Sequence, residues 1–397
     1  MKLLGVEDAR ARMLAAVSPL GAETVALEAA LGRVLAGDVN ALRDQPPFAA
    51  SAMDGWGARA ADTPGRLRII GESAAGHGFA GPVGPGEAVR IFTGAPVPAG
   101  ADVVIIQEDV TRDGDHILVP KATDPRHIRP VGQDFAAGAR LLERGLRLDP
   151  WRLSLAAAAG RARLEVVRRP RVAILSTGEE VVAPGATPGP FQIFNSGTTA
   201  LAALVSAWGG APLALASVGD DVAATARAVA DVSCDLVVTL GGASVGDHDL
   251  VKPAMARLGL AMAVESVAVR PGKPTWFGVL ADGRRVLGLP GNPASALVCA
   301  ELFLRPLIMA LQGGDPAVRL IPARIARALD ANGPREHWMR ACLDHAADGG
   351  LVAQAFADQD SSLVSVFAKA DALLRRRAGA PAVAPGAGVE VLRLERR

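Results

Sequence analysis

The sequence predicts a multidomain α/β protein, and three observations carry this prediction. The chain has 397 residues, more than one hydrophobic core usually holds, since single cores stop growing beyond about 250–300 residues. Residues 170–316 alternate apolar runs of strand length with stretches of helical period, the rhythm of a layered α/β/α domain. Residues 43–147 and 317–397 carry short apolar runs broken by Gly and Pro, which is typical of β structure.

Helical apolar periods mark the start of the chain and a segment near its middle. They predict helices over residues 6–17, 24–35 and 150–160. If the third helix packs on the first two, residues 1–42 and 148–169 form one elongated helical domain and residues 43–147 are a β domain inserted into it. Within the insertion, strands are expected at residues 68–70, 88–92 and 103–106.

Strands and helices are predicted in turn through residues 170–316. Strands are expected at 171–175, 213–218 and 235–240, helices at 196–208, 221–232, 249–258 and 293–311, and three short strands between the last two helices. Asn195 or Ser196 and Asp220 or Asp221 are the expected helix caps. Because helices separate the strands, the sheet should be mostly parallel. Alternation returns at 321–325 and 389–393, which predicts a small β-barrel-like domain over residues 317–397.

Charge and cysteine content exclude several classes of protein. Lys and Arg number 42 against 41 Asp and Glu, a net charge of +1, so there is no basic footprint for nucleic acid. Charged residues close to Met1 leave no secretory segment, and apolar runs such as 153–159 and 297–304 are shorter than the roughly 20 residues of a membrane helix. Cys234, Cys299 and Cys342 have no zinc or disulfide spacing, which favours a reducing cytoplasm.

Three glycine-containing loops follow predicted strands. They are LSTGEE at 175–180, LGGASVGDHD at 240–249 and GLPGNPAS at 288–295. Ligands of open α/β sheets bind where strands end, and glycines let backbone N–H groups approach a phosphate at the start of a helix. One such loop could be only a structural turn, but three on one sheet predict a phosphate or oxyanion ligand. Asp249 could hold a divalent cation there or merely cap its helix.

A rigid basic turn, Arg270-Pro271-Gly272-Lys273-Pro274, follows the second loop. The prolines fix φ and hold two cations at a set separation. An Arg fork and a Lys point charge suit a tetrahedral oxyanion. A solvated basic turn is the alternative.

The β insertion carries its own polar residues between tight turns. Asp54 follows the rigid entry Pro46-Pro47 and is either a functional carboxylate or the acceptor of an Asx turn. Thr93 lies in a second turn, and Arg129 precedes a third. The histidines show no metal-ligand spacing.

Six motifs together resemble the MoeA / gephyrin E-domain family of molybdenum insertases. They are SAMDGW (51–56), RIFTGAPVPAGAD (90–102), RPRVAILSTGEE (169–180), GGASVGDHD (241–249), RPGKP (270–274) and GLPGNPAS (288–295), and the likeness runs over residues 5–396. The resemblance implies that residues 170–316 bind molybdopterin. It also implies a homodimer, in which the β insertion of one subunit completes the cleft of the other.

The same resemblance implies a molybdopterin molybdenumtransferase, which inserts molybdate into adenylylated molybdopterin and releases AMP with the help of Mg²⁺. Asp54, Thr93, Glu180 and Asp249 are then the candidate catalytic residues, with Glu180 and Asp249 as metal ligands. The candidate binding residues are Ser176, Thr177, Gly178, Asp221, Gly241, Gly242, Ser244, Gly246, Arg270, Lys273, Pro274, Gly291, Asn292 and Ser295, with Arg129, Arg340 and Ser361 outside the α/β domain. Molybdoenzymes that receive the cofactor, or the preceding adenylyltransferase, are possible protein partners; nucleic acid and membrane are not.

The chain departs from the family pattern at several positions. Ala49-Ala50 stand where Asp-Asn is usual, Trp56 replaces a Tyr, Gln133 replaces a Glu, and Asp360 precedes Ser361 where a Gly is more usual. Two rival functions are an adenylyltransferase, whose loop reads closer to GGTG, and a receptor-clustering scaffold. The GGAS loop and the large additional domains disfavour the first rival, and the lack of a linker or appended partner domain disfavours the second.

Overall fold

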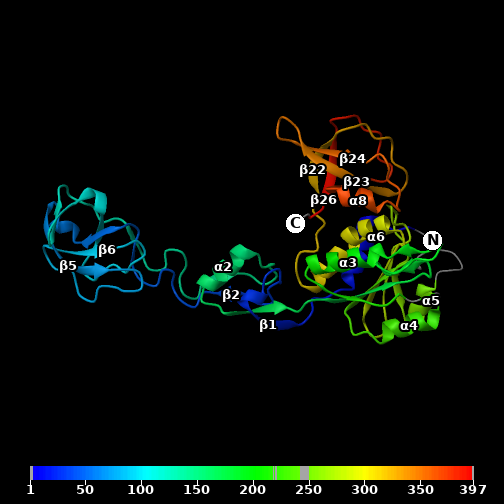
Figure 1. Ribbon diagram of the computed structural model, residues 1–397, viewed down its shortest axis with the longest axis horizontal. Coiled ribbons are helices and arrows are strands. Elements are labelled where there is room, and N and C mark those ends of the chain that lie inside the picture. Colours follow the sequence, from blue (N-terminus) through cyan, green and yellow to red (C-terminus); the bar gives the residue numbers. More distant parts are fainter. Residues whose placement is uncertain (1–2, 218, 220, 242–249, 396–397) are drawn as a thin grey trace. The chain divides into compact units, whose positions relative to one another are not determined.

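The computed structural model describes residues 3–217, 219, 221–241 and 250–395. The chain forms two compact units, whose elements are labelled in Figure 1. The main unit comprises Met1–Glu23, Gly32–Ala36 and Glu165–Arg397. The insertion unit comprises Thr24–Leu31 and Gly37–Leu164.

A six-stranded sheet lies at the centre of the main unit, in the order β16-β13-β17-β21-β20-β18. The parallel strands are β16 (Ala211–Ala214), β13 (Arg171–Ser176), β17 (Leu236–Leu240) and β21 (Arg285–Leu289), and the antiparallel ones are β20 (Trp276–Val279) and β18 (Ala261–Val264). In β13, Val172 and Ile174 pack into one core and Ala173 and Leu175 into another, so both faces are covered. The predicted, mostly parallel sheet is confirmed.

Beside this sheet lie the helices α3 (Ser196–Ala207), α4 (Val222–Ala230) and α5 (Val251–Ala256). Of these, α3 and α4 begin at the predicted caps, and α5 begins after Leu250 without a side-chain cap among the described residues. Asn195 accepts a hydrogen bond from Thr198 N, and Asp221 accepts from the N–H groups of Ala223 and Ala224. The strand predicted at 213–218 is misplaced, because Gly209 (φ 89°) ends α3 and the chain enters the sheet at once as β16. Residue 218 lies outside the described residues.

The predicted helix at 293–311 is confirmed, with a change of winding inside it. α6 (Pro293–Cys299) passes through a π-helical turn (Ala300–Leu304) into α7 (Arg305–Leu311). Pro306 has no N–H for a carbonyl one turn earlier, and such a missing bond is a common cause of irregular winding. Within the described residues this is the one helix with the length and hydropathy of a membrane span, and 89% of its apolar window is buried in the core.

The start of the chain confirms one predicted helix and contradicts another. α1 (Val6–Ala15) packs Val6, Ala9 and Met13 into the core of the main unit. The helix predicted at 24–35 is wrong: β1 (Ala22–Ala26) pairs with β12 (Arg163–Val167), and a single 3-10 turn (Leu27–Ala29) follows. Pairing with a distant strand overrides the local apolar period, and Gly32 in a left-handed conformation (φ 73°) stops any helix.

The insertion unit is built on a second six-stranded sheet, in the order β7-β4-β6-β5-β9-β8. The strands are β7 (Val103–Ile106), β4 (Gly55–Ala58), β6 (Glu87–Ile91), β5 (Gly65–Ser73), β9 (His116–Val119) and β8 (Thr111–Asp113). This confirms the three predicted strands. Trp56, at one of the departures from the family pattern, is buried in the core of this sheet with Arg90 over its ring. α2 (Pro150–Ala158) begins at the Asp149 cap, as the predicted third helix.

The predicted β-barrel is confirmed as a closed five-stranded barrel in the main unit. Its strands are β23 (Glu336–His345), β24 (Leu351–Ala355), β22 (Ile321–Ile325), β26 (Gly388–Arg393) and β25 (Ala372–Arg376), and β25 pairs back with β23. A short helix, α8 (Val364–Lys369), precedes β25. β19 (Val269–Arg270), from the α/β region, adds to the barrel in parallel with β23.

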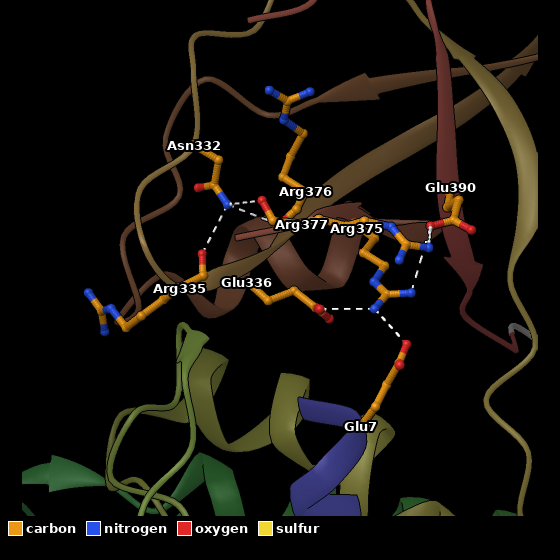
Figure 2. A network of polar contacts seen from close by, with 8 residues as sticks. All are labelled: Glu7, Asn332, Arg335, Glu336, Arg375, Arg376, Arg377 and Glu390. Carbon is orange, nitrogen blue, oxygen red and sulfur yellow. Dashed lines mark hydrogen bonds and ion pairs between the residues drawn. The ribbon is translucent and has the colours of Figure 1, made fainter. Parts of the chain in front are cut away.

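A buried arginine of the barrel links the barrel to α1 through ion pairs. Figure 2 shows Arg375 between Glu7 of α1 and Glu336 of β23, with N–O distances of 2.8 and 2.9 Å. Its other amino group lies 3.7 Å from Glu390, which also binds the exposed Arg377. The side chains of Arg375 and Glu336 are only 8% and 12% exposed, so this pair is held away from most of the solvent, whereas Glu7 is 63% exposed.

Candidate functional site

The three predicted loops leave the same edge of the central sheet. β13, β17 and β21 end in register at Ser176, Leu240 and Leu289. Thr177 N donates to Leu240 O (3.1 Å), and Gly241 N donates to Leu289 O (3.3 Å). The loops therefore lie side by side, as predicted for the carboxyl ends of parallel strands. Gly242, Ser244, Gly246 and Asp249 lie outside the described residues.

Glycines are required where these loops pack together. A Cβ on Gly241 (φ 87°) would lie 3.1 Å from Thr177 O, and one on Gly291 would lie 3.4 Å from Gly241 Cα. At Gly178 (φ 120°), an added Cβ would overlap the carboxylate of Glu180. Small residues thus let three backbones converge at one place, which is what binding an anion by backbone N–H groups needs.

The acidic residues near this edge differ in their surroundings. Glu180 is exposed, and within the described part of the chain no basic side chain pairs with it. Asp221 is an N-cap: hydrogen bonds from the N–H groups of Ala224 and Ala223 lower its pKa, so its carboxylate already has partners. Ser176 is buried, and its carbonyl accepts a bond from Ser217 Oγ (3.2 Å). No group of three His, Cys, Asp or Glu suited to a metal occurs among the described residues.

The basic turn is held between helix α6 and the barrel. Gly272 has φ 118°, and an added Cβ would overlap Cys299 Sγ of α6. Thr275 Oγ1 bonds Gly272 O (2.8 Å) and Cys299 Sγ (3.1 Å), and burial raises the pKa of that thiol to about 12. The thiol is therefore neutral and structural, as its sequence context indicates. Arg270 and Lys273 are exposed at either end of this fixed backbone, Pro274 follows, and Ser295 is buried on α6.

The barrel brings two further predicted residues to the third loop. Asn292 Nδ2 donates to Ser361 Oγ (2.8 Å), and Ala294 N donates to Ser361 O (3.2 Å). Arg340 on β23 is 1% exposed, and its Nη1 donates to Asp360 O (2.9 Å). Its Nη2 is buried without a hydrogen-bond partner among the described residues. A buried donor of this kind is ready for an acceptor that the chain itself does not supply.

Positive charge accumulates around the pairing of β19 with β23, where the basic turn meets the barrel. Arg270 lies opposite His337 in the β19–β23 pairing. The pKa of the buried His337 falls to about 4, first through burial and then through the charges of Arg270 and Arg340. His337 is therefore neutral at physiological pH, because both burial and the positive charges of Arg270 and Arg340 disfavour its protonation. Sequence reasoning did not select His337, because no residue pattern marks a histidine that only the barrel pairing brings beside Arg270.

The insertion unit holds Asp54 and Thr93 together. Asp54 Oδ1 accepts from Thr93 N (2.7 Å) and Thr93 Oγ1 (3.0 Å). These bonds, the backbone one first, lower the pKa of Asp54, so it is ionised at neutral pH. Its partner lies 39 residues away, so the Asx-turn alternative is wrong.

Arg129 lies in the same unit, on β10 (Ile128–Arg129), which pairs with β3 (Ala50–Ser51). A cavity of about 620 Å³ opens beside it, lined also by Arg43, Gln133 and Asp134. The departure at Gln133 therefore stands on the wall of a cavity.

Three family models match consecutive parts of the chain. Residues 4–160 match the MoeA N-terminal region (domain I and II), residues 173–310 a probable molybdopterin binding domain, and residues 322–394 the MoeA C-terminal region (domain IV). The chain belongs to the MoeA family. This agrees with the resemblance carried by the six motifs, and with the predicted role in molybdenum cofactor biosynthesis.

MoeA relatives resemble this chain along most of its length. Molybdopterin molybdenumtransferase 2 of Mycobacterium tuberculosis is 40% identical over 354 residues, 85% of this chain and 86% of that protein. The molybdopterin molybdenumtransferase of Bacillus subtilis is 33% identical over 385 residues, 93% of this chain and 89% of that protein. The crystal structure of a molybdopterin biosynthesis MoeA protein from Pyrococcus horikosii matches all of both chains with a TM-score of 0.85 at 31% identity.

Proposed function

We propose that this protein is the enzyme that inserts molybdenum from molybdate into adenylylated molybdopterin, releasing AMP and molybdenum cofactor. The observation that carries the proposal is that Ser361 of the barrel bonds the loop at Asn292, while the buried Arg340 bonds the neighbouring Asp360. A buried guanidinium with a free donor suits a small oxyanion. The glycine loops beside it suit the phosphates of a nucleotide-bearing pterin.

Substrate binding divides between two groups of residues. The phosphate end of the pterin and the AMP moiety would lie on the loops of the sheet edge, with backbone donors at Gly178, Gly242 and Gly246. The N–H groups of Thr177 and Gly241 already donate to Leu240 O and Leu289 O, so these two residues would shape the loops. Molybdate, a dianionic tetrahedral oxyanion, would bind the cations Arg270, Lys273 and Arg340 and the hydroxyls of Ser244, Ser295 and Ser361.

Magnesium fits the carboxylates near the sheet edge. Mg²⁺ commonly binds one or two protein carboxylates together with substrate phosphates, and Glu180 is exposed without a basic partner among the described residues. Glu180 and Asp249 would therefore hold the ion. When bound, it would supply charge neutralisation at the phosphates whose anhydride bond breaks. Glu180 would also orient the AMP side of the substrate.

A homodimer in the cytoplasm is part of the proposal. Asp54, Thr93 and Arg129 would complete the cleft of the partner subunit, with Asp54 as an ionised acceptor whose orientation Thr93 fixes. The product would then pass to molybdoenzymes that need the cofactor, and the preceding adenylyltransferase is a possible docking partner.

The test is an assay of AMP release from adenylylated molybdopterin by the purified protein. AMP release that requires both molybdate and Mg²⁺, with formation of cofactor able to activate a molybdoenzyme, is the expected result. Consumption of ATP with adenylylation of free molybdopterin would instead identify the rival adenylyltransferase. AMP release at the same rate without molybdate would overturn the insertase role.

A further inference from the structure

Arg340 is an unusual cation, because the structure buries it without neutralising it. Its side chain is 1% exposed, and no carboxylate lies within ion-pair distance among the residues that the structure describes. Its two bonded side-chain nitrogens reach only neutral oxygens, and Nη2 has no hydrogen-bond partner in the described part of the chain. A buried charge in this state costs stability. An anion supplied from outside the chain would remove that cost.

One glutamine fixes both the backbone and the side chain of Arg340. Gln359 Oε1 accepts from Arg340 N (2.9 Å) and from Arg340 Nε (3.2 Å). Gln359 Nε2 donates to Arg340 O (3.0 Å) and to Phe356 O (2.9 Å). Both the oxygen and the nitrogen of the Gln359 amide are therefore hydrogen-bonded to Arg340, and the nitrogen also to Phe356. Nη2 of Arg340 is the guanidinium nitrogen that has no partner among the described residues.

The acidic residues of this loop are turned to other partners. Asp360 binds Ser362 N (2.8 Å) and Ser362 Oγ (2.6 Å) through its carboxylate, and offers Arg340 only its backbone oxygen. Asp358 accepts from Asp360 N (2.8 Å). The charges of Asp358 and Asp360 act on Arg340 from nearby, but among the described residues neither carboxylate forms an ion pair with its guanidinium.

We propose that Gln359 is a positioning residue, which aims Arg340 at the molybdate oxyanion while leaving its charge available. A glutamate of the same shape could accept the same two hydrogen bonds, but it would neutralise the guanidinium, and it could not donate to Arg340 O and Phe356 O as Gln359 Nε2 does. The second amide of the site acts in parallel: Asn292 donates to Ser361 Oγ, so the hydroxyl proton of Ser361 is free for the same anion. This inference rests on the proposed function.

The test compares Gln359→Glu, Gln359→Met and a matched control, Gln354→Glu, in the full chain. Gln354 is exposed on β24, so its substitution adds the same charge to the same barrel. Molybdate binding is measured by equilibrium dialysis, and the thermal unfolding midpoint by calorimetry. Gln359→Glu is expected to weaken molybdate binding by at least about tenfold, as loss of one charge-assisted contact does. Its midpoint should also fall, because a carboxylate cannot donate the two hydrogen bonds that Gln359 Nε2 makes to Arg340 O and Phe356 O. Gln359→Met should lower the midpoint and weaken binding less, and the control should change neither.

Binding compared with the midpoint in the two variants separates a positioning role from a purely structural one. If Gln359→Glu binds molybdate within about twofold of the parent, or if both variants lose binding only in step with a lower midpoint, the proposal is overturned. A further variant, Arg340→Met, distinguishes a failure of the role of Gln359 from a failure of the proposed function. If the parent chain fails to bind molybdate, or if Arg340→Met binds it normally, both the proposed function and the role of Gln359 are overturned. If Arg340→Met binds molybdate weakly and Gln359→Glu binds it normally, only the role of Gln359 is overturned.

Discussion

The carboxylate of Asp54 illustrates what single residues contribute to this protein. It is solvent-exposed, yet two donors from Thr93 fix its orientation and keep it ionised. Arg340 is the opposite case, a buried cation whose Nε is bonded to Gln359 while its Nη2 has no partner among the residues that the structure describes. In both, hydrogen-bond partners far away in sequence determine what the side chain can do.

Lys273 should govern the affinity for molybdate. Replacing it with Ala removes a charge-assisted contact from a turn whose backbone Gly272 and Thr275 hold in place, so the fold should persist. We expect the molybdate concentration for half-maximal AMP release to rise roughly ten- to a hundredfold. Lys121→Ala, an exposed lysine of the insertion unit, is the control and should leave the curve unchanged. An unaltered molybdate dependence in Lys273→Ala would rule out its docking role.

Asp249 should be required for the chemistry more than for folding. Asp249→Asn keeps the size and one carbonyl oxygen but removes the negative charge that a Mg²⁺ ion needs. We expect AMP release to fall by orders of magnitude while binding of the adenylylated pterin and the unfolding midpoint persist. Because Asn caps a helix about as well as Asp, a fully active variant would mean that Asp249 only caps. Asp149→Asn, at the observed cap of α2, is the matched control and should be fully active.

At the scale of elements, the candidate site lies at the edge of the central sheet and at the junction between the α/β domain and the barrel. Three loops meet because three parallel strands end in register, and the basic turn is rigid because α6 and β23 hold it from two sides. The barrel adds Arg340 and Ser361 only because it stays attached to the α/β core. Two such elements, the Arg375 junction and the π-helical turn, should affect stability in ways that can be measured.

The Arg375 junction should stabilise the attachment of the barrel. Arg375→Met would leave Glu336, whose side chain is 12% exposed, without its cation. We expect the free energy of unfolding in urea to fall by roughly 2–4 kcal/mol, because an unpaired charge remains largely buried. Arg377→Met is the control in the same network: its side chain is 63% exposed, and loss of such a surface pair should cost less than about 1 kcal/mol. Equal losses for the two variants would contradict this account.

The π-helical turn should make stability depend on pH through Glu301. Burial raises the pKa of this carboxyl to about 7, with Arg305 opposing the shift. A folded pKa above the unfolded value means that the stabilisation is complete below about pH 4.5 and is lost as pH rises through about 7. The free energy of unfolding of the parent relative to Glu301→Gln should therefore fall by roughly 3 kcal/mol across this window. A constant difference between the two proteins from pH 4 to 8 would show that Glu301 does not titrate in this window.

At the scale of the whole molecule, the proposed cleft needs two chains. Mixing an Asp54→Ala chain with an Asp249→Ala chain should restore part of the activity, because one cleft of each mixed dimer has both residues intact. AMP release is measured after subunit exchange, which mass spectrometry of an isotopically labelled partner can verify. Each parent variant alone is the control. Mixed dimers as inactive as their parents would contradict a cleft shared between subunits.

The sequence by itself determined the class of the α/β domain, the β insertion and the barrel, and it selected the residues of the candidate site. Alternation of strand and helix periods, the caps at Asn195 and Asp221, and glycines after the strands were enough for the α/β fold and its binding edge. These signals are local, because caps and turns involve residues a few positions apart. The six motifs gave the family, which the family models confirm.

Only the tertiary structure decided which distant partners the remaining residues have. Residues 24–35 carry a helical period but become β1 and a 3-10 turn, because β12 supplies hydrogen bonds from more than a hundred positions away. Asp54 binds Thr93, and Gln359 binds Arg340, for the same reason: the partner is brought near by strand pairing, and no local pattern encodes it. Periodicity reports which face a residue prefers, whereas hydrogen bonds between distant segments depend on the completed fold.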